Sequence, residues 1–271
     1  MITHTIQNKI KLTESDQKYN QLRQLQNAFQ DELQLTPVVG GELEFYLSTN
    51  IDKQILSDKT RLNIITEKGQ NQFEINIPHS SNLVAAAKEI ANIRSGIINT
   101  SIDLGGFADF SSKPFQNDYG SSMHIHINFI QEYDIEKCAQ ILCNTLDQHI
   151  DSCLPTAQDY ERLDAKFMAP THIAWGGNNR TMLIRIPDSK PIRLEHRLPA
   201  ANSDPAIVLY SILSSLKEGL LTRNNNTCYL PKIYGNAFDK QYNLVRIYKK
   251  KRCNLMRYFQ KNNIKGVERY S

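Results

Sequence analysis

The sequence predicts an α+β fold in which helices cover one face of a β-sheet. Four segments carry apolar residues at the three- and four-residue steps of an amphipathic helix, and six others have strand character. Polar side chains also gather on one face of three of these strands. A chain of 271 residues is long enough to bury a substantial core around such a sheet.

The helix candidates start where a capping residue precedes an apolar periodicity. In the last of them Asp204 is the cap and Pro205 takes the first helical position. The four candidates are 14–34, the segment after Ser80–Ser81, the segment from Asp134 to Leu146, and 204–219. The strand candidates between them are 40–47, 61–66, 72–77, 123–130, 181–187 and 191–198.

Three of the strand candidates carry rows of ionisable or hydrogen-bonding side chains. Residues i, i+2 and i+4 of a strand share a face, so Glu42 and Glu44 point one way and Leu43 and Phe45 the other. The three rows are Glu42 and Glu44; His124, His126 and Asn128; and Arg193, Glu195 and Arg197.

Two interpretations of these rows stay open. Each row is the solvent face of a sheet packed on a core, or the rows together line a concave polar face that holds metal ions and phosphates. Solvent faces usually mix Lys, Thr and Ser, whereas these rows are Glu, His, Asn and Arg with almost no Lys. The composition of the rows favours the second interpretation.

Composition limits the classes of function. The formal net charge of +4 is too small to indicate a nucleic-acid binder. The five cysteines form no C-x-x-C pair, which favours reduced thiols. The N-terminal residues lack an apolar signal core, and no stretch approaches the roughly 20 apolar residues of a membrane-spanning helix. We therefore expect a soluble, cytoplasmic protein with small-molecule partners.

Seven short segments occur in the order of a known family. From about Val38 to Asp239 the chain resembles the catalytic domain of glutamine synthetases and related glutamate–amine ligases. The segments are GGELEFYL (40–47), EKGQNQFEINIPH (67–79), SSKPF with GSSMHIHINF (111–129), PTAQDYERL (155–163), NNRTMLIRIP (178–187), RLEHRLPAANSDP (193–205) and GNAFD (235–239). Seven segments in the right order indicate common descent.

The resemblance implies one domain with a curved, mainly antiparallel sheet and helices on its outer face. Residues 1–37 are then a helical lead-in, 38–239 the catalytic core and 240–271 a basic C-terminal segment.

The resemblance also implies two cation positions. Glu44, Glu67 and Glu74 correspond to the ligands of one cation, and Glu42, His124 and Glu195 to those of the other. The chemistry of the residues agrees, because clustered carboxylates repel one another unless cations lie between them. An oxygen-rich set with one imidazole suits Mg²⁺ or Mn²⁺ better than zinc, with two or three ions expected per site.

The remaining family positions concern ATP and the acidic substrate. Arg162 and Arg197 match the residues that clamp the carboxylates of glutamate, and Gly120 lies where backbone approaches that substrate closely. With Arg180 the two arginines form the implied catalytic set, since arginine stabilises charge on a moving phosphoryl group. The implied phosphate and nucleotide contacts are His126, Asn128, Arg180, Arg185, Lys190 and Arg193.

Several departures bear on the acceptor and on assembly. Met168 replaces the flap glutamate that, in the family, helps to take a proton from ammonium. Tyr119 and Ser122 replace the usual asparagine and glycine before the histidine strand. No counterpart of the family's N-terminal β-grasp domain precedes the first strand, so a homo-oligomer stays open but the usual ring with shared sites is not expected. The basic segment 249–252 belongs either to a solvated helix or to a basic amphipathic helix that contacts nucleic acid, an anionic membrane or a partner.

The resulting hypothesis is an ATP-dependent ligase that joins glutamate, or a similar acidic substrate, to an organic amine in preference to ammonia. Two alternatives stay open: a non-catalytic family member that binds or assembles, and a phosphotransferase that uses the same metal and ATP platform for another acceptor.

Overall fold

The computed structural model describes residues 14–222 and 229–248. The first half of the chain forms α1 (Glu14–Leu33), β1 (Pro37–Leu47), α2 (Lys53–Thr60), β2 (Ile64–Thr66), β3 (Gln72–Ser80), α3 (Leu83–Asp103), β4 (Ala108–Asp109) and β5 (Met123–Phe129). The second half forms α4 (Ile135–Asn144), α5 (Leu146–Cys153), η1 (Gln158–Arg162), η2 (Ala165–Phe167), β6 (Trp175–Gly176), β7 (Ile184–Arg185), β8 (Leu194–His196), α6 (Pro205–Leu221) and η3 (Lys240–Tyr242). Residues 1–13 of the expected lead-in and 249–271 of the expected basic segment lie outside the described residues.

The strands form one open sheet in the order β2-β3-β1-β5-β8-β7-β6, with β4 paired to β1. Only the short pair β6–β7 is parallel among the described strands, and every other pairing is antiparallel. The central strands β1 and β5 pair from Pro37↔Phe129 to Leu43↔Met123. The predicted α+β fold with a mainly antiparallel sheet is confirmed.

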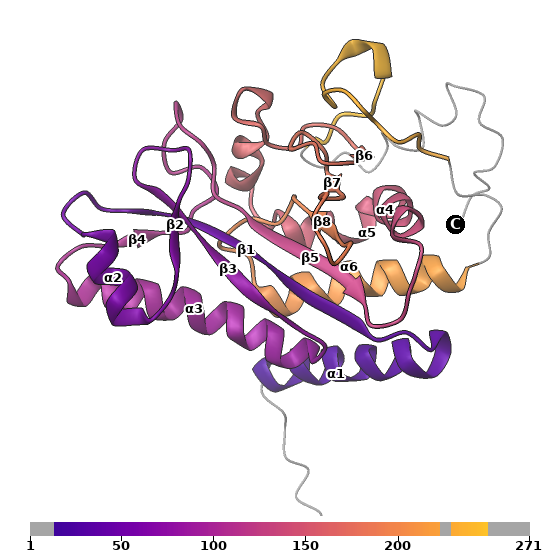
Figure 1. Cartoon of the computed structure of the whole chain (residues 1–271), viewed down its shortest axis with the longest axis horizontal. Helices are drawn as coiled ribbons and strands as arrows, with labels where there is room; N and C mark the ends of the chain where they lie inside the picture. Colours follow the sequence, from indigo (N-terminus) through magenta and orange to yellow (C-terminus); the bar gives the residue numbers. More distant parts are fainter. Residues whose placement is uncertain (1–13, 223–228, 249–271) are drawn as a thin grey trace, which may run out of the picture.

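Helices α1, α3 and α6 lie together on one side of the sheet, below it in Figure 1, and loops rise from the other side. The Asp204 carboxylate accepts hydrogen bonds from the backbone N–H groups of Ala206 and Ile207, which confirms the predicted start of α6. Asp134 caps α4 in the same way. The helix predicted from Asp134 to Leu146 is divided at Thr145, the residue that ends α4 and precedes α5.

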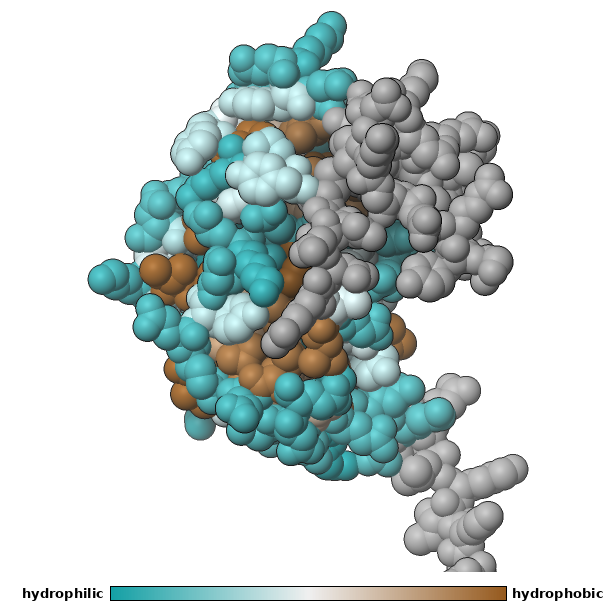
Figure 2. Space-filling model, turned by 90° about the vertical axis from the view of Figure 1, so that its right-hand side faces the viewer, coloured by the Kyte–Doolittle hydropathy of each residue, from teal (hydrophilic) through white to brown (hydrophobic). Residues whose placement is uncertain are grey.

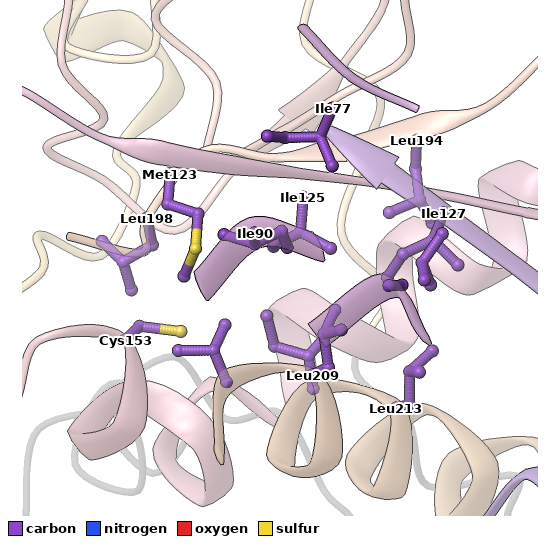
Figure 3. Packing of buried hydrophobic residues seen from close by; sticks show 14 of the residues in the cluster. Ile77, Ile90, Met123, Ile125, Ile127, Cys153, Leu194, Leu198, Leu209 and Leu213 are labelled. Carbon is purple, nitrogen blue, oxygen red and sulfur yellow. The ribbon is translucent and has the colours of Figure 1, made fainter. Parts of the chain in front are cut away.

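The apolar faces of the strands form the core with these helices. Leu43 and Phe45 of β1 are fully buried, as are Ile125 and Ile127 of β5. Figure 3 shows the β5 side chains among Ile90 of α3 and Leu209 and Leu213 of α6. The polar rows on the same strands consequently face away from the helices, as their two-residue period predicts.

Some elements were not predicted from the sequence. Helix α2 and the two-residue strands β4 and β6 are too short for a clear periodicity, and the strands expected at 181–187 and 191–198 shrink to β7 and β8. The described part of the face in Figure 2 is mainly hydrophilic, with smaller apolar areas. None of the helices in the described ranges combines the length and the apolar character that a membrane span requires.

Candidate active site

The polar rows come together because the strands that carry them are neighbours in register. Glu44 of β1 lies opposite Glu74 of β3, and Glu42 lies opposite His124 of β5. On the other side of β5, His126 is opposite Glu195 of β8, which in turn is opposite Arg185 of β7. We call the side chains of Glu42, Glu44, Glu74, His124, His126 and Glu195 the carboxylate floor.

The centre of the carboxylate floor is a cluster of two carboxylates and two imidazoles. The Glu42 carboxylate lies 3.0 Å from His124 Nδ1 and 3.5 Å from His126 Nε2. One potential ligand atom from each of Glu42, His126 and Glu195 lies within 4.8 Å of the others. His124 Nδ1 is 3.5 Å from Glu195 Oε1 and so belongs to the same cluster. Burial opposes the charge on Glu42, but its hydrogen bond with His124 and its proximity to His126 hold its pKa well below the ordinary value.

Glu195 is fully buried between two arginines. Its carboxylate pairs with Arg185 Nη1 at 2.6 Å and with Arg197 Nη1. Burial alone would raise the pKa of this carboxyl group, but Arg197, His124 and Arg185 outweigh burial and lower it. Glu195 is therefore anionic at neutral pH.

Glu44 is held by the residue that precedes the histidine strand. The Ser122 hydroxyl lies 2.6 Å from Glu44 Oε2 and 2.7 Å from His124 Nε2, and the Ser122 backbone N–H also donates to Glu44. One hydroxyl thus bridges the two groups of metal ligands that the resemblance implied. The sequence marked Ser122 only as a departure from the family.

Glu74 shows that the carboxylate floor carries excess negative charge. Burial, followed by repulsion from Glu42, Glu44 and Glu67, raises its pKa to about 8. A divalent cation among these oxygens would relieve the repulsion and displace the proton. Hard carboxylate oxygens with imidazole nitrogens fit Mg²⁺ or Mn²⁺, so the donor set fits the expected cofactor.

A pocket opens beside this floor. Seven of the predicted site residues line it: Glu44, Glu67, Gly120, His124, Arg162, Arg180 and Arg197. The pocket is also lined by Lys68, Gln72, Tyr119, Ser122, Phe167, Met168, Ala169 and Pro170. We call Tyr119 and 167–170 the apolar wall.

The two arginines implied for substrate binding are both buried. Arg162 Nη2 donates to the backbone carbonyls of 197–199, and burial lowers its pKa to about 10. Arg197 pairs with Glu195 through one nitrogen. The Nε atoms of both arginines are buried without a hydrogen-bond partner among the described residues. Unpaired buried donors are costly, so an anionic ligand in the pocket would satisfy them.

Gly120 is required by this packing. A Cβ atom there would lie 2.5 Å from Arg162 Cβ and 2.7 Å from the Ser112 carbonyl oxygen. The close approach is therefore between the backbone at Gly120 and the side chain of Arg162. Gly120 also lines the pocket, and its close approach to the substrate, which the resemblance implies, stays a prediction.

The residues implied for phosphate binding are less tightly grouped. Arg193 Nε lies 3.3 Å from His126 Nδ1, and Arg185 also donates to Asn178. Arg180 is exposed at the pocket, and Lys190 is exposed on the segment before β8. Asn128 lies further along β5, opposite Val38.

Sequence analysis missed several residues that line or support the pocket. Tyr46 and Gln72 continue the two-residue rows of Glu44 and Glu74, so the same periodicity was the available signal. The Tyr46 hydroxyl donates to the Tyr119 carbonyl at 2.9 Å. Phe167 lies in a short 3₁₀ turn, where no periodicity identifies it.

Solved structures share this fold. A structure described as a GmaS/ADP complex covers 91% of this chain and 68% of its own, with a TM-score of 0.69 at 19% identity. The Plasmodium falciparum glutamine synthetase covers 76% of this chain and 56% of its own, with a TM-score of 0.65 at 15% identity. At these identities the likeness shows the fold alone.

Curated relatives match by sequence over little more than half of the chain. Gamma-glutamylputrescine synthetase of Escherichia coli K12 is 25% identical over 193 residues, 65% of this chain and 40% of that protein. Glutamate–methylamine ligase of Methyloversatilis universalis is 28% identical over 178 residues, 57% of this chain and 39% of the relative. The chain thus spans about 40% of the length of these relatives.

The family is settled by a match that covers most of the core. Residues 60–140 and 142–243, well over half of the chain, match the family described as glutamine synthetase, catalytic domain. The match includes the strands of Glu74, His124 and Glu195, together with Gly120 and the segment around Arg162. This chain belongs to the glutamine synthetase catalytic-domain family.

Proposed function

We propose that the protein is an ATP-dependent ligase that activates the γ-carboxylate of glutamate as an acyl phosphate and couples it to an organic amine. The carboxylate floor supports this proposal, because its clustered acidic side chains lie beside a pocket that Arg162, Arg180 and Arg197 also line. Family membership supports ligase chemistry, and related proteins are named for joining glutamate to amines.

The metal-binding part of the proposal rests on the residues of the floor. Glu44, Glu67 and Glu74 would hold one cation, and Glu42, His124 and Glu195 the other, with His126 adjacent. Bound Mg²⁺ or Mn²⁺ would neutralise charge on the phosphates of ATP. The excess negative charge at Glu74 supports this assignment.

The reaction requires a leaving group on a carboxylate. A γ-carboxylate oxygen of glutamate forms a bond to the terminal phosphorus of ATP, and the bond from that phosphorus to the ADP oxygen breaks. The amine nitrogen then bonds to the carbonyl carbon of the activated γ-carboxylate, the bond from that carbon to the phosphate oxygen breaks, and the nitrogen loses one proton. The products are ADP, phosphate and the γ-glutamyl amide.

The arginines and histidines of the chain would bind the anionic parts of the substrates. Arg162 and Arg197 would hold the carboxylates of glutamate through the nitrogen donors that lack a partner. Arg180, Arg185, Lys190 and Arg193, with His126 and Asn128, would contact ATP and stabilise charge on the transferred group.

An organic amine is preferred to ammonia because of Met168. A thioether accepts no proton and offers no charge to an ammonium ion. Met168 lines the pocket, in the flap segment where the family carries a glutamate. Two relatives are named for putrescine and methylamine, which supports an organic acceptor.

The test is release of ADP and phosphate with Mg²⁺ or Mn²⁺, glutamate and a panel of amines, followed by mass spectrometry of the product. The proposal predicts ADP release that requires glutamate and a divalent ion, with a γ-glutamyl amide as product. Turnover that ignores glutamate, or no turnover with any amine, would contradict it. A phosphorylated product that persists without amine would instead indicate a phosphotransferase.

A further inference from the structure

Part of the pocket lining is apolar. Tyr119 and Phe167 meet edge to face, with ring centroids 5.3 Å apart. Met168, Ala169 and Pro170 line the same pocket. No residue of 167–170 carries a hydrogen-bonding or charged side chain. An apolar ligand gains free energy by covering these four side chains.

This apolar wall is held in place from both ends. At Tyr119 the carbonyl accepts from Tyr46 at 2.9 Å and the backbone N–H donates to Asp118 at 2.7 Å. At the other end, the backbone N–H of Met168 donates to the Ala165 carbonyl at 3.1 Å and closes the 3₁₀ turn. The wall is thus a preformed surface of the pocket.

Two lysines and two aspartates lie near the wall. The ammonium groups of Lys113 and Lys166 lie 3.8 and 5.0 Å from the centre of the Phe167 ring. Two lysines therefore already use the ring that would otherwise attract a cationic ligand. The carboxylates of Asp118 and Asp164 interact electrostatically with Lys113, accept hydrogen bonds from backbone amides and do not line the pocket.

The charged residues of the pocket add to this effect. Its lining contains four lysine or arginine side chains and two carboxylates. The cations are Lys68, Arg162, Arg180 and Arg197, and the carboxylates are Glu44 and Glu67. Both carboxylates belong to the proposed metal ligands, and the three arginines to the proposed sites for glutamate and ATP. A second positive charge on the acceptor would therefore find no free carboxylate partner in the pocket lining.

We infer that the acceptor is a monoamine with an apolar or aromatic substituent, seated against Tyr119, Phe167 and Met168. This inference rests on the proposed ligase function and gives its acceptor a chemical class. Ammonia would leave the wall uncovered, and a diamine such as putrescine would bring a second charge beside the lysines. Discrimination on the order of tenfold or more is expected from burial of a few methylene groups.

The test compares benzylamine and isobutylamine with putrescine and ammonia in wild-type protein and in two variants. Met168→Glu restores a carboxylate, and Met168→Gln is the uncharged control of matched size. Wild type should show at least about tenfold higher kcat/KM for the apolar amines. Met168→Glu should move the preference toward putrescine and ammonia, and Met168→Gln should not.

Hydroxylamine separates this inference from the proposed ligase function. It is a small nucleophile whose γ-glutamyl hydroxamate reports glutamate activation without using the apolar wall. Hydroxamate formation together with a wild-type preference for putrescine or ammonia would overturn the acceptor class and leave the ligase standing. Absence of hydroxamate would count against the ligase itself.

A binding measurement keeps the acceptor class testable without turnover. Ligand-observed NMR with Mg²⁺ and ADP should detect benzylamine at the wild-type protein, weaker binding to Met168→Glu, and a smaller loss of binding in Met168→Gln, which removes apolar contact without adding charge. No detectable benzylamine binding, or tighter binding of putrescine, would overturn the inference.

Discussion

The carboxylate floor, of which Glu44 and His124 line the pocket, and the apolar wall of the same pocket are built differently. The floor consists of side chains at alternate positions on adjacent strands, fixed by pairs such as Glu44↔Glu74 and His126↔Glu195. The wall comes from loops and a 3₁₀ turn, held by single hydrogen bonds such as that from Tyr46 to the Tyr119 carbonyl. The difference suggests that the floor sets the reaction and the wall selects the acceptor.

The largest effect is expected from a change to the floor. Glu42→Gln removes a carboxylate that contacts both His124 and His126. Turnover should fall by about a thousandfold or more with every amine, since the floor serves the step common to all of them. The assay is ADP release at saturating Mg²⁺. Glu89→Gln, an exposed position on α3, is the matched control. A loss of turnover with only some of the amines would show that the carboxylate floor also takes part in selecting the acceptor, and would contradict the separate roles of floor and wall.

The junction between the two regions should be sensitive to added volume. Gly120→Ala places a methyl group 2.5 Å from Arg162 Cβ and 2.7 Å from a backbone oxygen, neither of which can retreat freely. We expect the free energy of unfolding to fall by about 1–3 kcal/mol. In Gly96→Ala, within α3, the new methyl group meets nothing within 4 Å. That control should be stabilised by about 0.5–1 kcal/mol. Equal effects of the two changes in chemical denaturation would refute the close approach.

The floor should also respond to pH through Glu74. Its folded-state pKa is raised from 4.5 to about 8, so the folded protein binds this proton more tightly than the unfolded chain does. When a chelator keeps the protein free of metal, the contribution of Glu74 to the free energy of unfolding is present below about pH 4.5 and is lost as the pH rises through 8. Glu74→Gln should therefore lose less stability than wild type between pH 5 and pH 9 in thermal unfolding.

The same proton predicts a pH-dependent affinity for metal. Mn²⁺ must displace the proton on Glu74. Deprotonation of this one group should therefore increase the affinity for Mn²⁺ by about tenfold for each pH unit below pH 8. Isothermal titration in two buffers of different ionisation enthalpy would detect the released proton. If the affinity of the wild-type protein for Mn²⁺ depended on pH no more than that of Glu74→Gln, the assignment of Glu74 as a metal ligand would be contradicted.

A smaller effect is expected at Ser122. Its hydroxyl contacts Glu44 Oε2 at 2.6 Å and His124 Nε2 at 2.7 Å, and so orients two proposed ligands. Ser122→Ala should weaken Mn²⁺ binding by about tenfold, in the range found for groups that orient metal ligands. Ser214→Ala, a half-buried serine on α6, is the control. Unchanged affinity in Ser122→Ala would show that the hydroxyl only fills space.

The same contrast explains what the sequence predicted. The two-residue period of strands gives the face of Glu42, His124 and Glu195 directly, and capping residues locate α4 and α6. The order of the strands was not predicted, because a two-residue period identifies the face on which a side chain lies but not the neighbouring strand. The resemblance implied only a mainly antiparallel sheet. The pairing of Arg197 with Glu195 and the bridge at Ser122 depend on side-chain geometry in three dimensions. The wall at Tyr119 and Phe167 lies in loops, which have no repeating pattern to interpret.

The most direct test of the central claim follows the oxygen atoms of glutamate. With glutamate carrying ¹⁸O in its γ-carboxylate, ATP, Mg²⁺ and benzylamine, the inorganic phosphate is analysed by mass spectrometry. An acyl phosphate predicts one ¹⁸O atom in each phosphate released, matched by one γ-glutamyl amide. Unlabelled phosphate released with ADP would mean that water attacks ATP, and would contradict the proposed ligase.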